Sequence, residues 1–527
     1  MPRLLHGATI TLDAFRDATE TVAERSADVP LAFAAALPAD VQDFDFLFSD
    51  LQKKPGNLLP EARATRDDLV RLGQTMRDTG GAASGDSKIP AAYTYFGQFV
   101  DHDVTLETAS ATADQLIDPN LVPLPLADIR TRIRNLRTAT LDLDNVYGLP
   151  APRNGPKMQI GKVTPLNGTS KPTLRPPGKG DDNDVPREGR SASIEHDRAA
   201  LIGDPRNDEN TIVAQLQVAF LRAHNALVDR GETFRHARRI LRQHYQHIVL
   251  ADFLPRVCDP AIVRDILKNG NRIYNAFVEP FFLPLEYAVA AYRFGHTMVR
   301  AEYDFNLNFN TSGEPGTVPA TLGLLFTFTA LGGGPGPGVG FDTLPDNWII
   351  EWENFVEAGG PFNKARRLDP KLVEPLFHLQ GLTGAPEPGD KGRLAVRNLL
   401  RGYLLRIPTG QAVAKAVQAK WTIPALTPDQ VIAGAASAEQ AQILRESGFH
   451  KRTPLWYYIL AEAAVLGRGQ HLGPVGSIIV AEVLIGLVRR SEDSILRTPG
   501  WKPSLPGSRR GKFDLADLLR FAGVLKP

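Results

Sequence analysis

The sequence has almost no cysteine and no long apolar run. Cys258 is the single cysteine among 527 residues, so no disulfide can form within the chain. No stretch of roughly 18 or more apolar residues is present, so we expect no membrane span. The first part of the chain, Met1 to Ala18, lacks the apolar segment of a secretory signal, and we expect no Sec-type export.

An excess of charge of either sign is also lacking, because 60 Lys and Arg residues balance 59 Asp and Glu residues. A balanced chain gives no reason to expect nucleic acid or an anionic membrane as a partner. Hydrophobic residues make up 43% of the sequence, which is enough for a large buried core. Length alone suggests about three or four domains.

Residues 96–105 combine apolar and ionisable side chains in one short stretch, Phe-Gly-Gln-Phe-Val-Asp-His-Asp-Val-Thr. Phe96, Phe99 and Val100 are spaced as they would be along the buried side of a helix. Pro90 precedes them, and proline suits the first turn of a helix. The pattern therefore predicts a buried helix of about three turns.

This helix would carry four polar side chains. Gln98 and His102 are four residues apart and share one face. Asp101 borders that face, whereas Asp103 lies about 100° further round. An ordinary core histidine between two capping acids is the alternative, but each buried polar group would then need a partner. We predict that Gln98, His102 and Asp101 face one cavity and Asp103 faces a second site.

Four later segments contain candidate site residues, although each by itself has a simpler explanation. In residues 138–144, Asp142 and Asp144 alternate with leucines. Alternating oxygen side chains suit a calcium ion, although two aspartates spaced in this way usually lie in a surface turn. Residues 203–210 open a long amphipathic helix that Asn207 or Asp208 would cap, and Arg206 could simply pair with Glu209 on the surface.

The third segment, residues 286–300, is largely apolar and carries His296 directly after Gly295. A buried neutral histidine is a usual ligand of iron, although a hydrogen-bonded core histidine is the default explanation. Residues 394–406 form another apolar helix that contains Asn398 and Arg401.

The rest of the chain supplies the scaffold. Helical periodicity predicts further helices at residues 63–78, 234–249, 348–355 and 473–488, the second with a solvated His and Arg face and the last strongly buried. Residues 151–197 are rich in Pro, Gly and charge, which indicates a long surface excursion. No internal repeat and no alternation of strands with helices is found.

The 96–105 stretch resembles the distal-histidine motif of the animal-type haem peroxidases, in the peroxidase–cyclooxygenase superfamily. The later segments follow in the family's order, and the resemblance covers about residues 45–525. It identifies the chain as a bacterial-type member and implies a mainly α-helical fold. We expect an N-terminal arm, residues 1–60, packed on a single haem-peroxidase domain, residues 61–527.

The resemblance also implies roles for individual residues. His102, Arg206 and Gln98 would be catalytic, and His296 would bind the iron of haem b, with its Nδ1 proton accepted by Asn398. Arg293 and Arg401 would lie near the haem propionates, and Asp101 and Glu209 would form ester links to the haem. One calcium ion would be held by Asp103, Thr138, Thr140, Asp142 and Asp144. The sulfonium link known in the family needs Met where this chain has Asn210.

The implied function is a haem peroxidase that reduces hydrogen peroxide through a ferryl haem intermediate. Its donors would be halides, thiocyanate or small phenolic compounds, as in a response to oxidative stress. The resemblance favours an extracellular location, but the missing Sec-type signal and the single cysteine leave the compartment open. We expect a monomer.

Two alternatives stay open. One is a fatty-acid oxygenase of the same superfamily. Cyclooxygenases place a radical-forming tyrosine three residues before the proximal histidine, where this chain has Arg293, and Tyr292 is out of register. The other is a non-enzymatic adhesion or matrix protein on a peroxidase scaffold, which should have lost His102 or Arg206.

Overall fold

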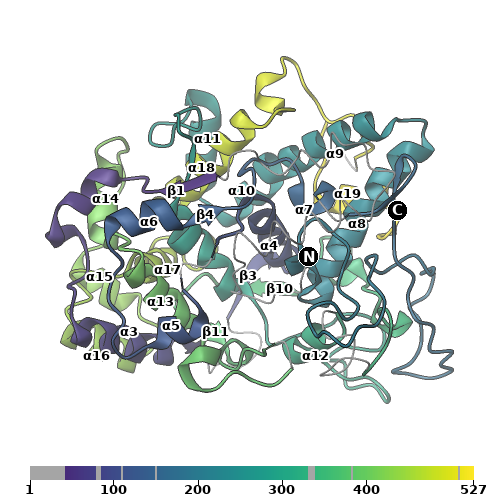
Figure 1. The fold of residues 1–527 in the computed structure, drawn as a ribbon, viewed down its shortest axis with the longest axis horizontal. Coiled ribbons are helices and arrows are strands. Elements are labelled where there is room, and N and C mark those ends of the chain that lie inside the picture. The colour runs from purple at the N-terminus through teal and green to yellow at the C-terminus, as the bar shows by residue number, and fades with distance from the viewer. Residues whose placement is uncertain are drawn as a thin grey trace.

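Helix α4, Ala92–Val104, lies in the interior with helices on both sides of it (Figure 1). The computed structural model describes residues 42–78, 85–108, 111–148, 151–329, 339–381, 384–507 and 511–526. Helices α8 (Thr211–Asp229) and α9 (Phe234–Ile248) are on one side of α4, and α3 (Arg63–Thr75), α13 (Leu394–Leu404) and α17 (Leu455–Val465) are on the other. The predicted helix at residues 96–105 is thus confirmed, and the fold is mainly α-helical.

The remaining helices and strands are short, with one exception. The long helix is α18 (Pro474–Arg490), which is buried as predicted. The others are α5 (Ala113–Ile117), α6 (Leu126–Arg132), α7 (Asp144–Tyr147), α10 (Leu254–Val257), α11 (Pro260–Asn269), α12 (Leu322–Thr327), α14 (Gly410–Gln418), α15 (Pro428–Ala433), α16 (Ala438–Glu446) and α19 (Leu515–Phe521). The strands are β1 (Gln42–Asp45), β2 (Arg77–Asp78), β3 (Asp86–Pro90), β4 (Arg134–Asn135), β5 (Arg153–Asn154), β6 (Lys157–Met158), β7 (Phe282–Pro284), β8 (Glu302–Tyr303), β9 (Ala320–Thr321), β10 (Lys364–Arg366) and β11 (Leu372–Val373).

Aromatic side chains fix α4 against its neighbours. Phe99 stacks on Phe220 of α8, with ring centroids 4.5 Å apart. Phe96 and Phe99 both meet Tyr245 of α9 edge to face. Such ring pairs add to the free energy gained by burying the rings themselves. The sequence predicts Pro90 in the first turn of the helix. In the structure, Pro90 is instead the last residue of strand β3.

The segment that carries His296 is not a regular α-helix. It begins with a π-helical turn, η5 (Glu286–Ala290), and continues as a 3₁₀ helix, η6 (Ala291–Met298). Departures of this kind from α-helical geometry are frequent at functional sites. Segment η6 packs against both α4 and α17.

Two other predicted helices differ from expectation. In place of the helix predicted at residues 348–355, the chain forms two short 3₁₀ turns, η7 (Asp346–Trp348) and η8 (Trp352–Asn354). The side chain of Asn306 donates to the carbonyl groups of Asn347 and Ile349 at 2.8 Å each. The expected solvated face of α9 is partly buried. Arg242 donates to the carbonyl of Asp142, and His244 accepts from the backbone of the C-terminal segment.

The described part of the N-terminal arm is joined to the rest of the chain by backbone pairing. Strand β1 pairs antiparallel with β4 and parallel with β7. The N–H groups of Leu47 and Phe48 donate to the buried carboxyl group of Glu286 on η5. Burial raises the pKa of Glu286 to about 7. Residues 1–41 lie outside the described residues, and the proposed boundary at residue 60 stays a prediction.

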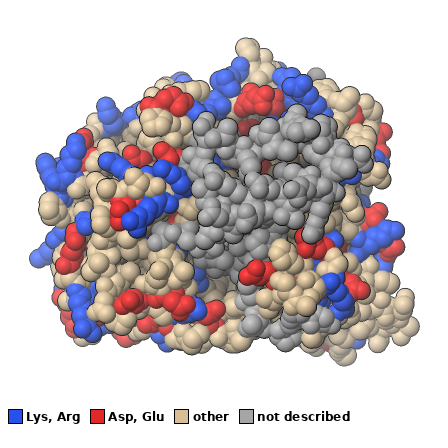
Figure 2. Space-filling view, viewed as in Figure 1, with Lys and Arg blue, Asp and Glu red and all other residues tan. Residues whose placement is uncertain are grey.

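Residues 151–197 are held on the body of the molecule by a buried ion-pair cluster. Arg187 donates to both Asp184 and Asp208, and all three side chains are buried. On the surface, basic and acidic side chains are interspersed over the described part of the face shown in Figure 2. Among the described residues, no helix is long and apolar enough to cross a membrane.

Candidate active site

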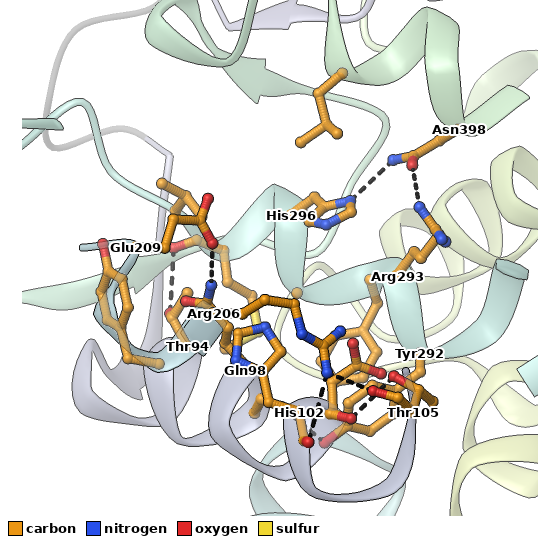
Figure 3. A pocket seen from close by; sticks show the side chains of 18 of the residues that line it. Thr94, Gln98, His102, Thr105, Arg206, Glu209, Tyr292, Arg293, His296 and Asn398 are labelled. Carbon is orange, nitrogen blue, oxygen red and sulfur yellow. Dashed lines mark hydrogen bonds between the residues drawn. The ribbon is translucent and has the colours of Figure 1, made fainter. Parts of the chain in front are cut away.

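One cavity lies between α4 and the short 3₁₀ helix η3 (Pro205–Asp208) on one side and η6 and α13 on the other. Figure 3 shows the side chains of His102 and Arg206 on the first side and that of His296 on the second. The cavity brings together the residues predicted to act on peroxide or to bind haem, namely Gln98, Asp101, His102, Arg206, Glu209, Arg293, His296, Asn398 and Arg401. Segments almost 300 residues apart in sequence therefore form a single site.

His102 is buried, and its ring is held in one orientation. Its Nδ1 atom lies 2.7 Å from Oδ1 of Asn207. Asn207 had been considered as the cap of α8, but Asn210 has that role and accepts from the N–H of Val213 at 3.0 Å. The prediction of the cap was therefore wrong. Asn210 caps α8 because η3 forms one more turn first, so that α8 begins only at Thr211.

A buried carboxylate holds Arg206 against α4. Asp204 accepts from Nε and Nη2 of Arg206 at 3.0 and 2.7 Å and also accepts from Arg137. Burial opposes the charged form of Asp204, but Arg137 and Arg206 together lower the pKa of Asp204 below its usual range. Arg206 also donates to the carbonyl of Thr105 at the end of α4. The sequence pattern did not reveal Asp204 or Arg137, because their pairing is tertiary.

Gln98 and Glu209 are linked directly. Gln98 donates from Nε2 to Glu209 at 3.0 Å and accepts from Nδ2 of Asn210 at 3.2 Å. Glu209 does not form the surface pair with Arg206 that the spacing alone would suggest, since Glu209 is buried and lines the cavity. Asp101, one residue before His102, is half-buried and also lines the cavity.

His296 is paired with Asn398, as predicted, but the amide of Asn398 donates to the ring and does not accept from it. Nδ2 of Asn398 lies 2.8 Å from Nδ1 of His296, while Oδ1 of Asn398 accepts from Arg293 at 2.7 Å. A guanidinium group can only donate, so it takes the carbonyl oxygen of the amide and turns the NH₂ group toward the ring. The pairing of Asn398 with His296 was predicted, but not the competition from Arg293.

Three arginines lie close together at this end of the cavity. Burial and the nearby charge of Arg401 lower the pKa values of Arg293 and Arg397 to about 10 each. Glu107 pairs with Arg401 at 2.8 Å. Arg397 was not predicted, although it is four residues before Arg401 and therefore on the same face of α13. The cluster is suited to a ligand with anionic groups.

The predicted calcium loop lies against α4 at Asp103, away from the cavity. Asp103 accepts from the N–H groups of Leu143 and Asp144 at 3.2 and 2.5 Å. Thr138 donates to Asp144, and Thr140 donates to Asp142. Among the described residues, no group of three or more His, Cys, Asp or Glu side chains is arranged as a set of metal ligands.

Two features of this loop nevertheless suit a cation. Oδ1 of Asp142 is buried and has no hydrogen-bond partner among the described residues. Ala139 and Leu143 have φ values of 48° and 59°, in the left-handed region that residues with a side chain rarely adopt. Such strain persists only where surrounding contacts enforce it, and it is common at ligand sites.

Tyr292 also faces the cavity. Its hydroxyl group donates to the carbonyl of Gly97 on α4 at 3.2 Å. Its ring lies 4.9 Å from that of Tyr287, measured between centroids. The position three residues before His296 is Arg293, which turns to Asn398. The structure thus places a tyrosine in the cavity, one position away from where a cyclooxygenase-like radical site would need it.

Comparison with known proteins finds sequences similar to part of this chain. The sequence model described as animal haem peroxidase matches residues 126–322. A peroxidase-like protein of Margaritifera margaritifera is 28% identical over 296 residues, which are 47% of this chain and 35% of that protein. Myeloperoxidase of Mus musculus is 26% identical over 348 residues, which are 55% of this chain and 46% of that protein. The chain therefore spans less than half the length of these curated relatives.

Solved structures show the same fold. Peroxidase A from Dictyostelium discoideum gives a TM-score of 0.51 at 17% identity, covering 81% of this chain and 83% of that one. Fatty acid alpha-dioxygenase of Oryza sativa gives 0.50 at 14% identity, covering 81% and 73%. The predicted fold class, a mainly helical single domain of this type, is confirmed. Part of the chain is thus similar in sequence to animal haem peroxidases, and its fold is similar to that of the two solved structures.

The shared carboxylate of Asp204 leads to a prediction about stability. Asp204→Asn should lower the free energy of unfolding at pH 7 by about 3–5 kcal/mol, because two buried guanidinium groups lose their counter-charge. The pKa of Asp204 is lower in the folded protein than its value of about 3.9 in an unfolded chain. Its stabilisation is therefore complete above about pH 4 and is lost as the pH falls further.

Denaturant midpoints of wild type and Asp204→Asn, measured from neutral to acidic pH, test this prediction. The difference between the two proteins should be large at pH 7 and should shrink below about pH 4. Asp50→Asn is the control, because Asp50 pairs with Lys53 on the open surface and should leave the midpoint almost unchanged. A difference that does not vary with pH would contradict the assignment.

Proposed function

We propose that the protein is a haem peroxidase that reduces hydrogen peroxide. One observation carries the proposal: His102 and His296 reach the same cavity from opposite sides, and Arg293, Arg397 and Arg401 line it as well. Haem has an iron that histidine can ligate, an apolar ring and two anionic propionates, so the residues present fit the group. Bound haem would supply the redox chemistry of peroxide reduction, and the protein would orient the reactants.

His296 is the proposed ligand of the iron. Ligation through Nε2 requires the proton of the ring to be on Nδ1, and that proton then needs an acceptor. Oδ1 of Asn398 can accept it only if the amide is turned and Arg293 gives its hydrogen bond to another acceptor. A propionate next to Arg293 and Arg401 provides such an acceptor, with Arg397 as a further cation beside it.

His102 and Arg206 are the proposed catalytic residues. With its proton on Nδ1, His102 takes a proton from the nearer oxygen of peroxide at Nε2 and returns it to the leaving oxygen. The guanidinium group of Arg206, fixed by Asp204, stabilises the negative charge that develops as the O–O bond breaks. Gln98 holds peroxide, water or a halide beside the ring. Halides, thiocyanate and small phenols are the proposed electron donors.

Haem loading tests this assignment. His296→Ala should lose haem or bind it loosely, because the iron loses its proposed protein ligand. His102→Ala should keep haem, but its rate of reaction with peroxide should fall by about 10²-fold or more, because the acid–base group is removed. Haem content and the Soret band, followed by stopped-flow mixing with peroxide, measure both effects. His378→Ala is the control, since His378 is an exposed residue that pairs with Glu374. An unchanged Soret band in His296→Ala would refute the ligand.

Asp101 and Glu209 are proposed to link the haem covalently. Each carboxylic acid would form an ester with a haem methyl group, releasing two protons and two electrons that reduce one peroxide to two waters. Mass spectrometry of proteolysed protein after peroxide treatment should therefore show two haem–peptide links. Asp101→Asn and Glu209→Gln should each remove one link and leave the other. Haem that extracts unmodified from the treated wild type would contradict this proposal, as would links that survive both substitutions.

One calcium ion is proposed at the loop of Thr138, Thr140, Asp142 and Asp144, with Asp103 completing the shell. The unpartnered Oδ1 of Asp142 and the strained backbone support this proposal. Because Asp103 follows His102 on α4, the ion would hold the loop to the helix that carries the catalytic base.

Atomic emission should find one calcium per chain in the native protein. Chelation, or Asp103→Ala, should remove it and slow the reaction of the haem-loaded protein with peroxide. Asp118→Asn, a substitution outside the loop, is the control and should retain the metal. A native protein without bound calcium would exclude the site, and removal of calcium without any change in rate would exclude its effect on His102.

A fatty-acid oxygenase is the second candidate, because Tyr292 lies in the cavity and its hydroxyl group contacts α4. Oxygen uptake with a saturated fatty acid, compared with bromide and thiocyanate turnover, separates the two functions. A non-enzymatic role is disfavoured by the specific contacts that His102 and Arg206 keep in the cavity. Bacterial-type membership, an extracellular location and a monomeric state stay predictions.

A further inference from the structure

A continuous chain of hydrogen bonds runs from the ring of His102 back to its own helix. Nδ1 of His102 lies 2.7 Å from Oδ1 of Asn207, and Nδ2 of Asn207 donates to Oε1 of Gln217 at 2.9 Å. Gln217 donates from Nε2 to the backbone carbonyl of Asn145 at 3.2 Å. Asn145 donates from Nδ2 to the carbonyl of Phe99 on α4 at 2.9 Å. The chain thus crosses from η3 to α8, then to α7, and returns to α4.

The three amide residues of this chain are completely buried. Asn207, Gln217 and Asn145 each have 0% of their surface exposed. A buried amide costs free energy unless its donors and acceptors are used. Gln217 stands in the middle of the apolar helix α8, where a hydrophobic residue would pack at no such cost. The position of Gln217 is therefore explained by what its amide does rather than by packing.

The direction of every bond follows from the far end of the chain. The carbonyl of Asn145 can only accept, so Gln217 must present its NH₂ group there and its oxygen to Asn207. Asn207 must then donate to that oxygen and turn its own oxygen to His102. An amide oxygen can only accept, so Nδ1 of His102 must carry a proton. A backbone carbonyl thus sets the tautomer of a histidine through two side chains.

We propose that Asn207, supported by Gln217, is a positioning residue that holds neutral His102 as the Nδ1–H tautomer. The lone pair of the ring is then on Nε2, the nitrogen that exchanges a proton with a molecule in the cavity. The same bonds fix the plane of the ring. This role deepens the proposed peroxidase function and rests on it, because a general base acting on peroxide needs the lone pair on that nitrogen.

The tautomer can be measured without haem. Protein labelled with ¹⁵N in its histidines gives two-bond ¹H–¹⁵N spectra in which a protonated ring nitrogen and one with a lone pair have different shifts. Comparison with His102→Gln identifies the signals of His102 among the 11 histidines. We expect the wild type to show a proton on Nδ1 and a lone pair on Nε2 at a pH where the ring is neutral.

Substitutions along the chain should change this pattern in order. Asn207→Ala removes the acceptor, so the Nε2–H form should appear. Asn207→Asp keeps an acceptor at the ring and should restore the Nδ1–H form. Gln217→Leu does not touch His102 but frees the amide of Asn207 to turn, so a mixture of both forms should result. In haem-loaded protein, Asn207→Ala should slow the reaction with peroxide by about 10²-fold.

The matched control is Gln215→Leu. Gln215 is also a buried amide of α8, two residues before Gln217, but it donates to the carbonyl of Asn183 and accepts from the N–H of Ile350. Gln215→Leu removes as many hydrogen bonds from α8 as Gln217→Leu does, but none of them belongs to the chain that ends at His102. The signals of His102 should therefore be unchanged in this variant.

Three outcomes would overturn the inference. They are an Nε2–H form in the wild type, a wild-type pattern in both Asn207→Ala and Gln217→Leu, and an altered pattern in Gln215→Leu that equals that of Gln217→Leu. If Asn207→Ala fails to fold, the wild-type spectrum and Gln217→Leu still decide. A protein with the expected tautomer that never binds haem would refute the proposed function and not the hydrogen-bond chain.

Discussion

The structure depends on one constraint: α4 is buried on nearly every side and yet carries polar side chains that each need a partner. Aromatic residues on the same helix fix it against α8 and α9. The polar residues then determine what surrounds them. Gln98 is paired with Glu209, His102 with Asn207, and Asp103 with the N–H groups of the loop before α7. Two segments distant in sequence, residues 143–144 and 207–209, are thereby bound to a single helix.

The short helix η3 concentrates much of this chemistry. Together with its two flanking residues it supplies Asp204 to hold Arg206, Asn207 to hold His102, and Glu209 to the cavity. This 3₁₀ turn ends before α8 begins and does not continue into it as one helix. The same feature moves the start of α8 to Thr211 and leaves Asn207 available for the ring of the histidine.

The hydrogen bonds of the two histidines in the cavity, His102 and His296, are determined in different ways. Next to His102, a chain of amides ends on the backbone carbonyl of Asn145. Because this carbonyl can only accept, it fixes which group donates and which accepts in each bond of the chain. Next to His296, the amide of Asn398 lies between the ring and Arg293, and the guanidinium group decides which end faces the ring. An anionic partner for Arg293 would reverse that choice. The orientation of the amide beside His296 therefore depends on charge, and that of the amide beside His102 depends on the backbone.

The sequence by itself determined the helix at residues 96–105, because periodicity is a local property, and the face shared by Gln98 and His102 follows from helical geometry alone. Resemblance to a family named the residues that meet in the cavity, although no spacing in the sequence places residue 102 near residue 398. Tertiary structure alone decided the hydrogen-bond partners. Asn207 looked like a helix cap, and Asp204, Arg137 and Gln217 gave no signal at all. Periodicity shows which side chains are buried, but it does not show which donor will reach a given acceptor, since that depends on how separate helices pack.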